Sequence, residues 1–183
     1  MKDITPEALR KLLRYEPTTG KLYWRERTPD MFDEGKYDAS RTCKSFNTRC
    51  AGKEAFTAYH KDGYKHGVIF GKPYLAHRVI WAIVNGEWPK VIDHVNGDRS
   101  DNRIGQLSNG SHQTNAKNAA RRVDNNSGVC GVGWFCRYGK WVSRIQVNGK
   151  RKTLGYFTSF EEAVEARKKA EKVYGFHENH GRG

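Results

Sequence analysis

The sequence of 183 residues has few cysteines and no long apolar run. Its cysteines form no Cys-x-x-Cys pair, so we expect no structural zinc and interpret them as free thiols in a reducing compartment: Cys43, Cys50, Cys130 and Cys136. No run of about 18 apolar residues is present, and the N-terminus "MKDITPEALRKLL" lacks the apolar core of a signal peptide. These absences predict a cytoplasmic protein without membrane association.

Acidic side chains are scarce relative to basic ones. Twenty Asp and Glu stand against 33 Lys and Arg, which gives a net charge of +13. Residues 121–183 contain thirteen basic and six acidic residues, a balance of +7, and this leaves +6 for residues 1–120. Because both halves are basic, we expect both to contact a polyanion, and nucleic acid is the first candidate.

Local patterns predict several small modules of mixed α+β class. Thr5 and Pro6 favour the start of a helix, with Leu9, Leu12 and Leu13 on one face, which Pro17 and Gly20 would end. "GKLYWRER" is typical of a short strand, whereas residues 28–54 are polar and are interpreted as loop-rich. A hairpin with its turn near Gly71 and a helix over Leu75–Val84 follow, the helix burying Val79, Ile80, Ile83 and Val84.

The segment "VIDHVNGDRSDNRIGQLSNGSHQTNAKN", residues 91–118, predicts a strand, a long loop, a short strand and a helix capped by Ser111. Asp93 and His94 offer a carboxylate for a metal on a scissile phosphate and a general base for the attacking water. Neighbours on a strand point to opposite faces, so both can serve one site only at the strand's end. From the helix, Asn115 and His112 are the available partners for a cation such as magnesium.

The same segment, preceded by "YLAHRVIW", resembles the HNH homing endonucleases, whose core is the ββα-metal fold. The resemblance implies that His94 is the general base, that Asp93 and Asn115 hold Mg²⁺ or another divalent cation such as Mn²⁺, and that the substrate is double-stranded DNA. The family's middle asparagine, which braces the loop holding the base, falls on Gln106, whose amide sits one methylene further out. Candidate phosphate contacts are His112, Arg78, Asn102 and Arg103, and His77 is expected to pack between helix and nuclease core.

The C-terminal third predicts a three-stranded sheet with one helix across its back. "RVDNNSG", residues 122–128, is a linker by composition, and "KWVSRIQV" alternates, with Trp141, Ser143, Ile145 and Val147 on one face. Asn148-Gly149 favours a tight hairpin turn, and a helix would run from a Ser159–Glu162 capping box to Gly175.

Residues 127–175 resemble the APETALA2 or ethylene-response-factor domain, which also occurs behind HNH nucleases of phages and bacteria. The resemblance implies that the sheet lies in the DNA major groove. Base-reading candidates are Arg144 and Gln146, joined by Arg137, Tyr138 and Arg151, because Arg suits guanine and Gln suits adenine. Phosphate-contact candidates are Lys140, Lys150 and Lys152.

These patterns predict five parts: an N-terminal module with DNA contact (1–54), the nuclease core (55–121), the linker (122–128), the DNA-binding domain (129–176) and a tail (177–183). The leading hypothesis is a site-specific homing endonuclease, monomeric or homodimeric, which acts in a bacterial host cell if it is phage-encoded. The alternative is a DNA-binding regulator with an inactive core, motivated by Gln106, and an RNA-binding protein is the third.

Overall fold

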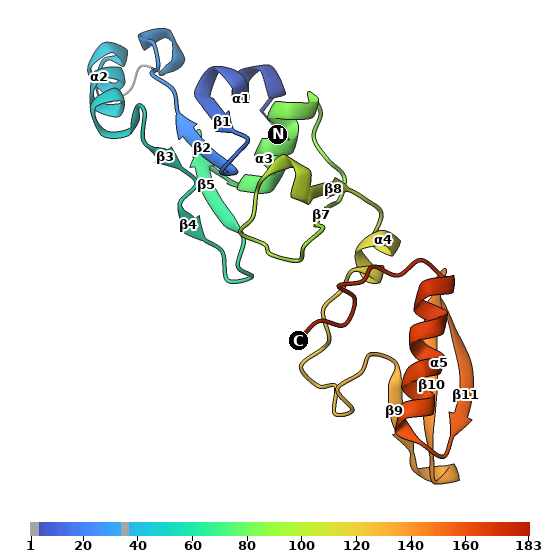
Figure 1. Ribbon diagram of the computed structural model, residues 1–183. Helices are drawn as coiled ribbons and strands as arrows, with labels where there is room; N and C mark the ends of the chain where they lie inside the picture. Colours follow the sequence, from blue (N-terminus) through green and yellow to red (C-terminus); the bar gives the residue numbers. More distant parts are fainter. Residues whose placement is uncertain (1–3, 34–36) are drawn as a thin grey trace. The chain divides into compact units, whose positions relative to one another are not determined.

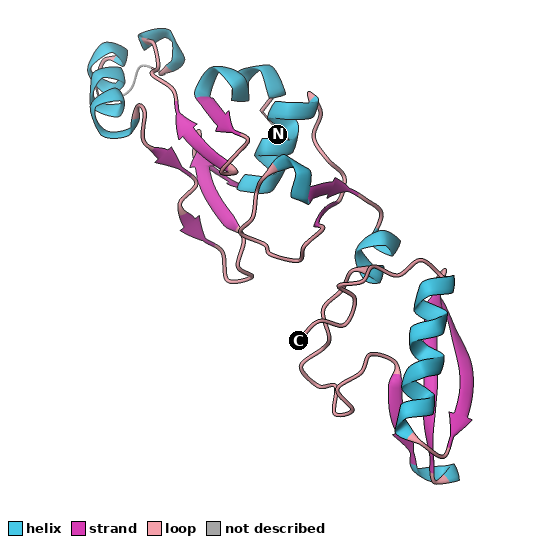
Figure 2. Ribbon diagram, in the orientation of Figure 1, coloured by secondary structure: helices cyan, strands magenta, loops and turns pink. Residues whose placement is uncertain are grey.

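The computed structural model describes residues 4–33 and 37–183, with the side chains of 112–114 left out of the description. It divides into two compact units, Met1–Asn109 and Gly110–Gly183. Each unit combines helices with small antiparallel sheets (Figures 1 and 2), which confirms the predicted α+β class. Within the described ranges, no helix is long and apolar enough to span a membrane. The finer domain limits remain predictions.

The chain begins with a short helix and a hairpin. Helix α1 (Pro6–Leu12) starts as predicted, since the Thr5 hydroxyl accepts the N–H of Ala8 at 3.3 Å. The predicted end at Pro17 and Gly20 is wrong, because strand β1 (Leu13–Glu16) follows at once and pairs with β2 (Lys21–Trp24). Pro17 and Gly20 belong to the turn between these strands, and β3 (Glu54–Ala55) completes the sheet.

The polar stretch predicted to be loop-rich contains a helix, so that prediction is wrong. After the 3₁₀ turn η1 (Pro29–Met31), helix α2 (Ala39–Cys50) begins at Asp38, whose side chain accepts the N–H of Arg41. Its inner side carries Cys43, Phe46 and Asn47, and Asn47 exchanges two hydrogen bonds with the backbone of Arg27, at 3.0 and 2.9 Å. These long-range contacts stabilise a helix whose own residues are mostly polar.

The centre of the first unit is a sheet against a buried helix. Strands β4 (Ala58–Tyr59), β5 (Lys65–Ile69) and β6 (Lys72–Leu75) form the sheet, with the predicted turn at Phe70-Gly71, where φ is 49° and 73°. Helix α3 (Ala76–Asn85) is also as predicted, and Val79 and Ile80 are fully buried beside α1. The buried stripe differs in one place: Val84 is 43% exposed, and Ala82 is buried instead.

The segment that carries Asp93 and His94 follows α3 and crosses into the second unit. Strand β7 (Ile92–His94) pairs with β8 (Leu107–Asn109), after the 3₁₀ turn η2 (Ile104–Gln106), and helix α4 (His112–Lys117) comes next, which confirms the predicted order. Helix α4 is shorter than predicted because the following backbone pairs with the C-terminal tail, Gly181 N–H donating to Ala119 and Arg121 N–H to Arg182.

The second unit contains the predicted sheet and helix. Strands β9 (Val132–Phe135), β10 (Lys140–Val147) and β11 (Lys150–Phe157) lie in the order β11-β10-β9, the 3₁₀ turn η3 (Cys136–Tyr138) joins the first two, and helix α5 (Phe160–Val173) packs on the sheet. The turn at Asn148-Gly149, with φ of 51° and 74°, and the Ser159 cap are confirmed.

Candidate functional site

Asp93 and His94 lie at the end of a strand, as the sequence predicts. Asp93 pairs with Ser108 and His94 with Leu107, after which the chain turns, Gly97 N–H donating to the carbonyl of His94 at 2.8 Å. The two side chains differ in environment: His94 is 3% exposed, whereas Asp93 is partly exposed. Consecutive residues at the end of β7 therefore carry a partly exposed carboxylate and a buried imidazole.

Asn102 holds the His94 imidazole. Its side-chain oxygen lies 3.3 Å from His94 Nε2, and Asn102 is itself only 2% exposed. An amide oxygen can only accept a hydrogen bond, so Nε2 of the neutral ring carries the hydrogen and the basic lone pair lies on Nδ1. Burial lowers the pKa of His94 below its ordinary value, although the Asn102 bond and the carboxylate of Asp93 act in the opposite direction. Burial and the Asn102 side-chain oxygen together favour a neutral His94 imidazole with its hydrogen on Nε2.

Gln106 contributes through its main chain. Its carbonyl accepts the N–H of Val95 at 2.9 Å, and its N–H donates to the carbonyl of Arg103 at 2.8 Å, so it closes the base of the loop that begins after His94. The amide that contacts the imidazole belongs to Asn102, which the sequence analysis counted among the phosphate contacts. The sequence feature that pointed to Asn102 is the family's Asp-Asn-Arg triplet, here Asp101-Asn102-Arg103.

The loop between the two strands is held by its own polar side chains. Asn96 accepts the N–H of Asp98 and donates to Asp101 at 2.8 Å, while Asp98 accepts both donors of Ser100. Two guanidinium bonds from Arg103 to Asp101, at 2.8 and 2.6 Å, lower the pKa of that carboxyl to about 2. In this loop, hydrogen bonds from Asn, Asp and Ser side chains therefore take the place of the backbone hydrogen bonds of a regular strand or helix.

The N-terminal hairpin also contacts the loop between β7 and β8. The Tyr15 hydroxyl donates to the carbonyl of Asn102 at 3.2 Å and accepts the N–H of Ile104 at 2.8 Å. At Gly20, where φ is 71°, an added Cβ would lie 2.6 Å from the backbone nitrogen of Arg103. Neither residue could be assigned to the site from the sequence, because contacts across more than 80 positions leave no local pattern.

His77 and Tyr64 pack against the imidazole. The His77 and His94 ring centroids are 5.1 Å apart, and Tyr64 lies 4.8 Å from His77 and 5.8 Å from His94. His77 is 5% exposed, and burial lowers its pKa to about 3, with smaller contributions from His94 and Arg78. The predicted packing role of His77 is confirmed, and the neutral ring fixes the position of His94.

The predicted phosphate contacts have partners within the protein. Arg78 Nη2 donates to the carbonyl of Pro89 at 2.7 Å, which holds the chain leading into β7. Arg103 is bound to Asp101 and Asn102 contacts His94. His112 begins α4, but its side chain lies outside the described residues.

The predicted metal ligands come from different units. Asp93 belongs to the first, and Asn115 lies in α4 of the second, its N–H bound to the carbonyl of Ser111 at 3.1 Å. A carboxylate and an amide oxygen are donors that suit a hard cation such as magnesium. Among the described residues, no three His, Cys, Asp or Glu side chains form a metal-binding group. Cys43, Cys50, Cys130 and Cys136 are free thiols.

The predicted DNA-binding residues divide between two faces of the C-terminal sheet. Trp141 contacts Phe160 of α5, with ring centroids 4.8 Å apart, and Lys152 donates to Tyr174 just after α5, so these side chains lie on the helix side. Residues paired across strands share a face, so Lys150, opposite Val147, also lies on this side. The opposite side, here called the open face, carries four of the predicted residues: Lys140, Arg144, Gln146 and Arg151.

Aromatic rings lie beside these polar groups on the open face. Phe135, Tyr138 and Tyr156 contact one another with centroid distances of 5.1 to 5.6 Å, and the Arg144 guanidinium lies 5.6 Å from the Phe135 ring. Tyr138 is 55% exposed, and Arg137 beside it in η3 is exposed as well. A hollow of about 830 Å³ in this unit is lined by Arg144, Gln146 and Arg151 together with Arg122. Cations, one amide and aromatic rings thus occupy a single surface.

Comparison with known proteins agrees with this picture for one segment. Residues 74–117 match the family model described as HNH endonuclease, a stretch that includes α3, β7, β8 and α4. Neither the curated proteins nor the solved structures give a match. The match supports a nuclease and implies DNA as the substrate, and nucleases of this family generally use a divalent metal.

Proposed function

We propose that this protein is a site-specific DNA endonuclease of homing type, in which His94 is the general base. The observation that carries the proposal is the His94–Asn102 contact at the end of β7, beside the partly exposed Asp93. It supplies an oriented imidazole and, on the preceding residue, a carboxylate, which can serve as general base and metal ligand in phosphodiester hydrolysis.

Each residue has a separate task in this proposal. His94 takes the proton of the attacking water, and Asn102 keeps the ring oriented. Asp93 and Asn115 would hold a divalent cation, Mg²⁺ or Mn²⁺. The role of Asn115 is inferred from its position in the motif that resembles the HNH family. The cation, when bound, would stabilise the negative charge that develops on the phosphate and on the leaving oxygen.

The C-terminal sheet is the proposed sequence reader. Its open face presents Arg144, Gln146 and Arg151 beside aromatic rings, and Arg and Gln pair with guanine and adenine in the major groove. This supports an APETALA2-type DNA-binding domain, with Lys140 as a phosphate contact on the same face. A protein that acts on DNA as a monomer or homodimer in the cytoplasm, in a bacterial host cell if it is phage-encoded, fits these parts.

The test is cleavage of plasmid, phage and bacterial genomic DNA by the full chain with Mg²⁺ or Mn²⁺. We expect wild type to cut, EDTA to abolish cutting, and His94→Ala to lower the rate by about 10²- to 10⁴-fold while it still binds DNA. His60→Ala is the matched control, because His60 is an exposed histidine of the same unit, paired with Asp62.

Two outcomes contradict the proposal. Wild type that leaves all DNA uncut with several metals, yet binds a defined sequence, is the result expected of the regulator with an inactive core. His94→Ala that cuts as fast as wild type removes the general-base role.

A further inference from the structure

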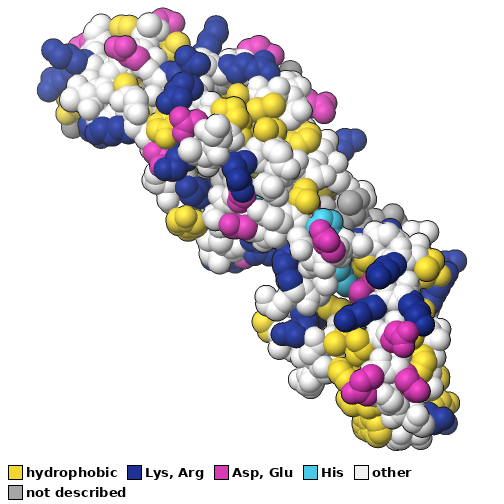
Figure 3. Space-filling view, in the orientation of Figure 1, with side chains coloured by type: hydrophobic (Ala, Val, Ile, Leu, Met, Phe, Trp, Pro, Cys, Tyr) yellow, Lys and Arg dark blue, Asp and Glu magenta, His cyan; other side chains and the backbone are white. Residues whose placement is uncertain are grey.

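Helix α2 has an outer face that carries only positive charge. One shallow hollow of about 310 Å³ is lined by five of its exposed side chains, Arg41, Lys44, Ser45, Thr48 and Arg49. Residues 39–50 contain no Asp or Glu. Figure 3 shows Lys and Arg side chains at the end of the first unit where Figure 1 draws α2. Like charges three to five residues apart repel one another, so this face favours an anionic partner.

The inner face of α2 is fixed to the rest of its unit. Besides the two Asn47 bonds, the Cys43 thiol lies 3.1 Å from the carbonyl of Arg27, and the Arg27 guanidinium lies 3.9 Å from the centre of the Phe46 ring. Phe46 also packs edge-on against Trp24, 5.8 Å away. Because the helix is fixed in this way, its outer face keeps one orientation relative to the unit, which lowers the entropic cost of binding.

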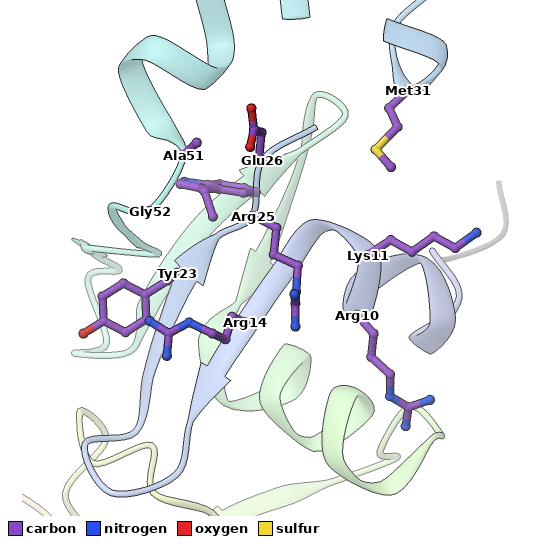
Figure 4. A pocket seen from close by; sticks show the side chains of 10 residues that line it. Arg10, Lys11, Arg14, Tyr23, Arg25, Glu26, Met31, Ala51 and Gly52 are labelled. Carbon is purple, nitrogen blue, oxygen red and sulfur yellow. The ribbon is translucent and has the colours of Figure 1, made fainter. Parts of the chain in front are cut away.

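A second basic surface begins where α2 ends. Ala51 and Gly52, which follow the helix, line a hollow of about 620 Å³ together with one acidic residue, Glu26, and four basic residues, Arg10, Lys11, Arg14 and Arg25 (Figure 4). Backbone carbonyls hold two of these guanidinium groups at Nε: Arg10 donates to Ile83 at 2.8 Å and Arg25 to Leu13 at 3.2 Å. Donors held in this way suit phosphate oxygens.

We propose that α2 lies in the major groove of duplex DNA, while the hollow lined by Arg10, Lys11, Arg14 and Arg25 holds the adjoining sugar-phosphate backbone. This proposal rests on the proposed function, because it takes double-stranded DNA as the substrate. The B-form major groove, about 12 Å wide, admits one helix. Arg41, Lys44 and Arg49 then replace condensed counterions. Ser45 supplies a hydroxyl at the base edges, and Thr48, whose hydroxyl donates to the Lys44 carbonyl at 2.9 Å, offers an acceptor there.

Helix α5 provides a matched comparison within the same chain. It also exposes three lysines, Lys168, Lys169 and Lys172, but its outer face mixes them with acids, and Lys169 is 2.8 Å from Glu165. Figure 3 shows both signs of charge interspersed there. Removal of three charges from α5 therefore changes the net charge as much as removal from α2, without loss of a uniformly basic face.

The experiment compares Arg41→Gln/Lys44→Gln/Arg49→Gln with Lys168→Gln/Lys169→Gln/Lys172→Gln, both in the His94→Ala chain without divalent metal. Binding to fluorescent duplexes cut from phage and bacterial genomic DNA is measured from 50 to 200 mM salt. We expect the α2 variant to bind at least about tenfold more weakly and the log-log salt slope to fall by about 2.7, since three phosphate contacts are removed and each contributes about 0.9. The α5 variant should stay within about twofold of the parent. Melting temperatures verify that all proteins are folded.

Equal effects of the two triple variants, or no effect of either, overturn the proposal. A duplex RNA of the same sequence separates groove binding from general charge attraction, because the A-form major groove is too narrow for side chains. We expect no α2-dependent binding to it, and equal dependence for RNA and DNA overturns the major-groove placement. Since binding is measured without cleavage, failure of the nuclease proposal appears separately, as wild type that does not cut DNA.

Discussion

The loop around His94 and the open face of the C-terminal sheet are both rich in polar residues, yet they are built in opposite ways. In the loop, His94 and Asn102 are 3% and 2% exposed, and side chains bind one another and the backbone. On the open face, Lys140 and Gln146 are exposed and Tyr138 is 55% exposed. Buried polar groups with partners keep a fixed geometry, whereas exposed ones remain available to a ligand.

This difference matches the two tasks of the proposed nuclease. A general base contributes to hydrolysis only when it is positioned within hydrogen-bond reach of the water, so its surroundings must be rigid before the substrate arrives. A DNA-reading surface gains affinity when it exchanges water and counterions for base edges and phosphates, so its side chains must be exposed. Three predictions test this difference between the rigid loop and the exposed sheet face, and they follow from the largest expected effect to the smallest.

Asn102→Ala should give the largest of these three effects. It removes the acceptor of His94 Nε2, and loss of such a partner behind a reactive histidine typically costs about 10- to 100-fold in activity. We expect kcat to fall by this factor while the affinity for DNA is unchanged, as measured by single-turnover cleavage and by binding without metal.

Asn102→Asp is the conservative variant, because its carboxylate still accepts the hydrogen of Nε2, and it should recover most of the lost rate. Asn85→Ala, at the exposed end of α3, controls for loss of an asparagine. An Asn102→Ala protein that melts like wild type and cuts as fast contradicts the positioning role.

Arg144→Ala and Lys152→Ala should separate the two faces of the sheet. Arg144 lies on the open face, and a good bidentate base contact contributes about 1–3 kcal/mol of discrimination, so its loss should relax sequence preference in a selection from randomised duplexes. Lys152 lies on the helix side, bound to Tyr174 at 3.2 Å, so its loss should leave both preference and salt dependence nearly unchanged. Equal losses for both variants contradict the assignment of faces.

Elements with a strong local pattern could be predicted from the sequence. The α3 pattern, the Asn148-Gly149 turn and the Ser159 cap are each encoded within a few neighbouring residues, and all three are present in the structure. Helix α2 was missed because its inner face relies on Cys43, Phe46 and Asn47 rather than on a stripe of aliphatic residues. Its stability comes from Arg27, a partner outside the helix.

The candidate site shows the same division. Asp93 and His94 could be placed at a strand end from the short apolar run before them, and the structure confirms that place. The hydrogen bond that orients His94 could not be predicted, because the sequence offers amides at both Asn102 and Gln106. Only the path of the loop decides which one faces the ring, and that path depends on Tyr15 and Gly20 from the distant N-terminal hairpin.

Tyr15→Phe should give the smallest of the three effects, and it tests whether the N-terminal hairpin sustains the rigidity of the loop. The change deletes one hydroxyl that bridges Asn102 and Ile104, and a hydrogen bond of this kind contributes about 1 kcal/mol to stability. Because the hydroxyl acts on Asn102 through its carbonyl, and not on His94 directly, we expect kcat to fall by only a few fold with KM unchanged. Tyr59→Phe, at a tyrosine 62% exposed in the same unit, is the control. If Tyr15→Phe lowers the melting temperature but leaves kcat as in wild type, the hairpin stabilises the fold without orienting the base, and the rigidity of the site must then come from the bonds within the loop itself.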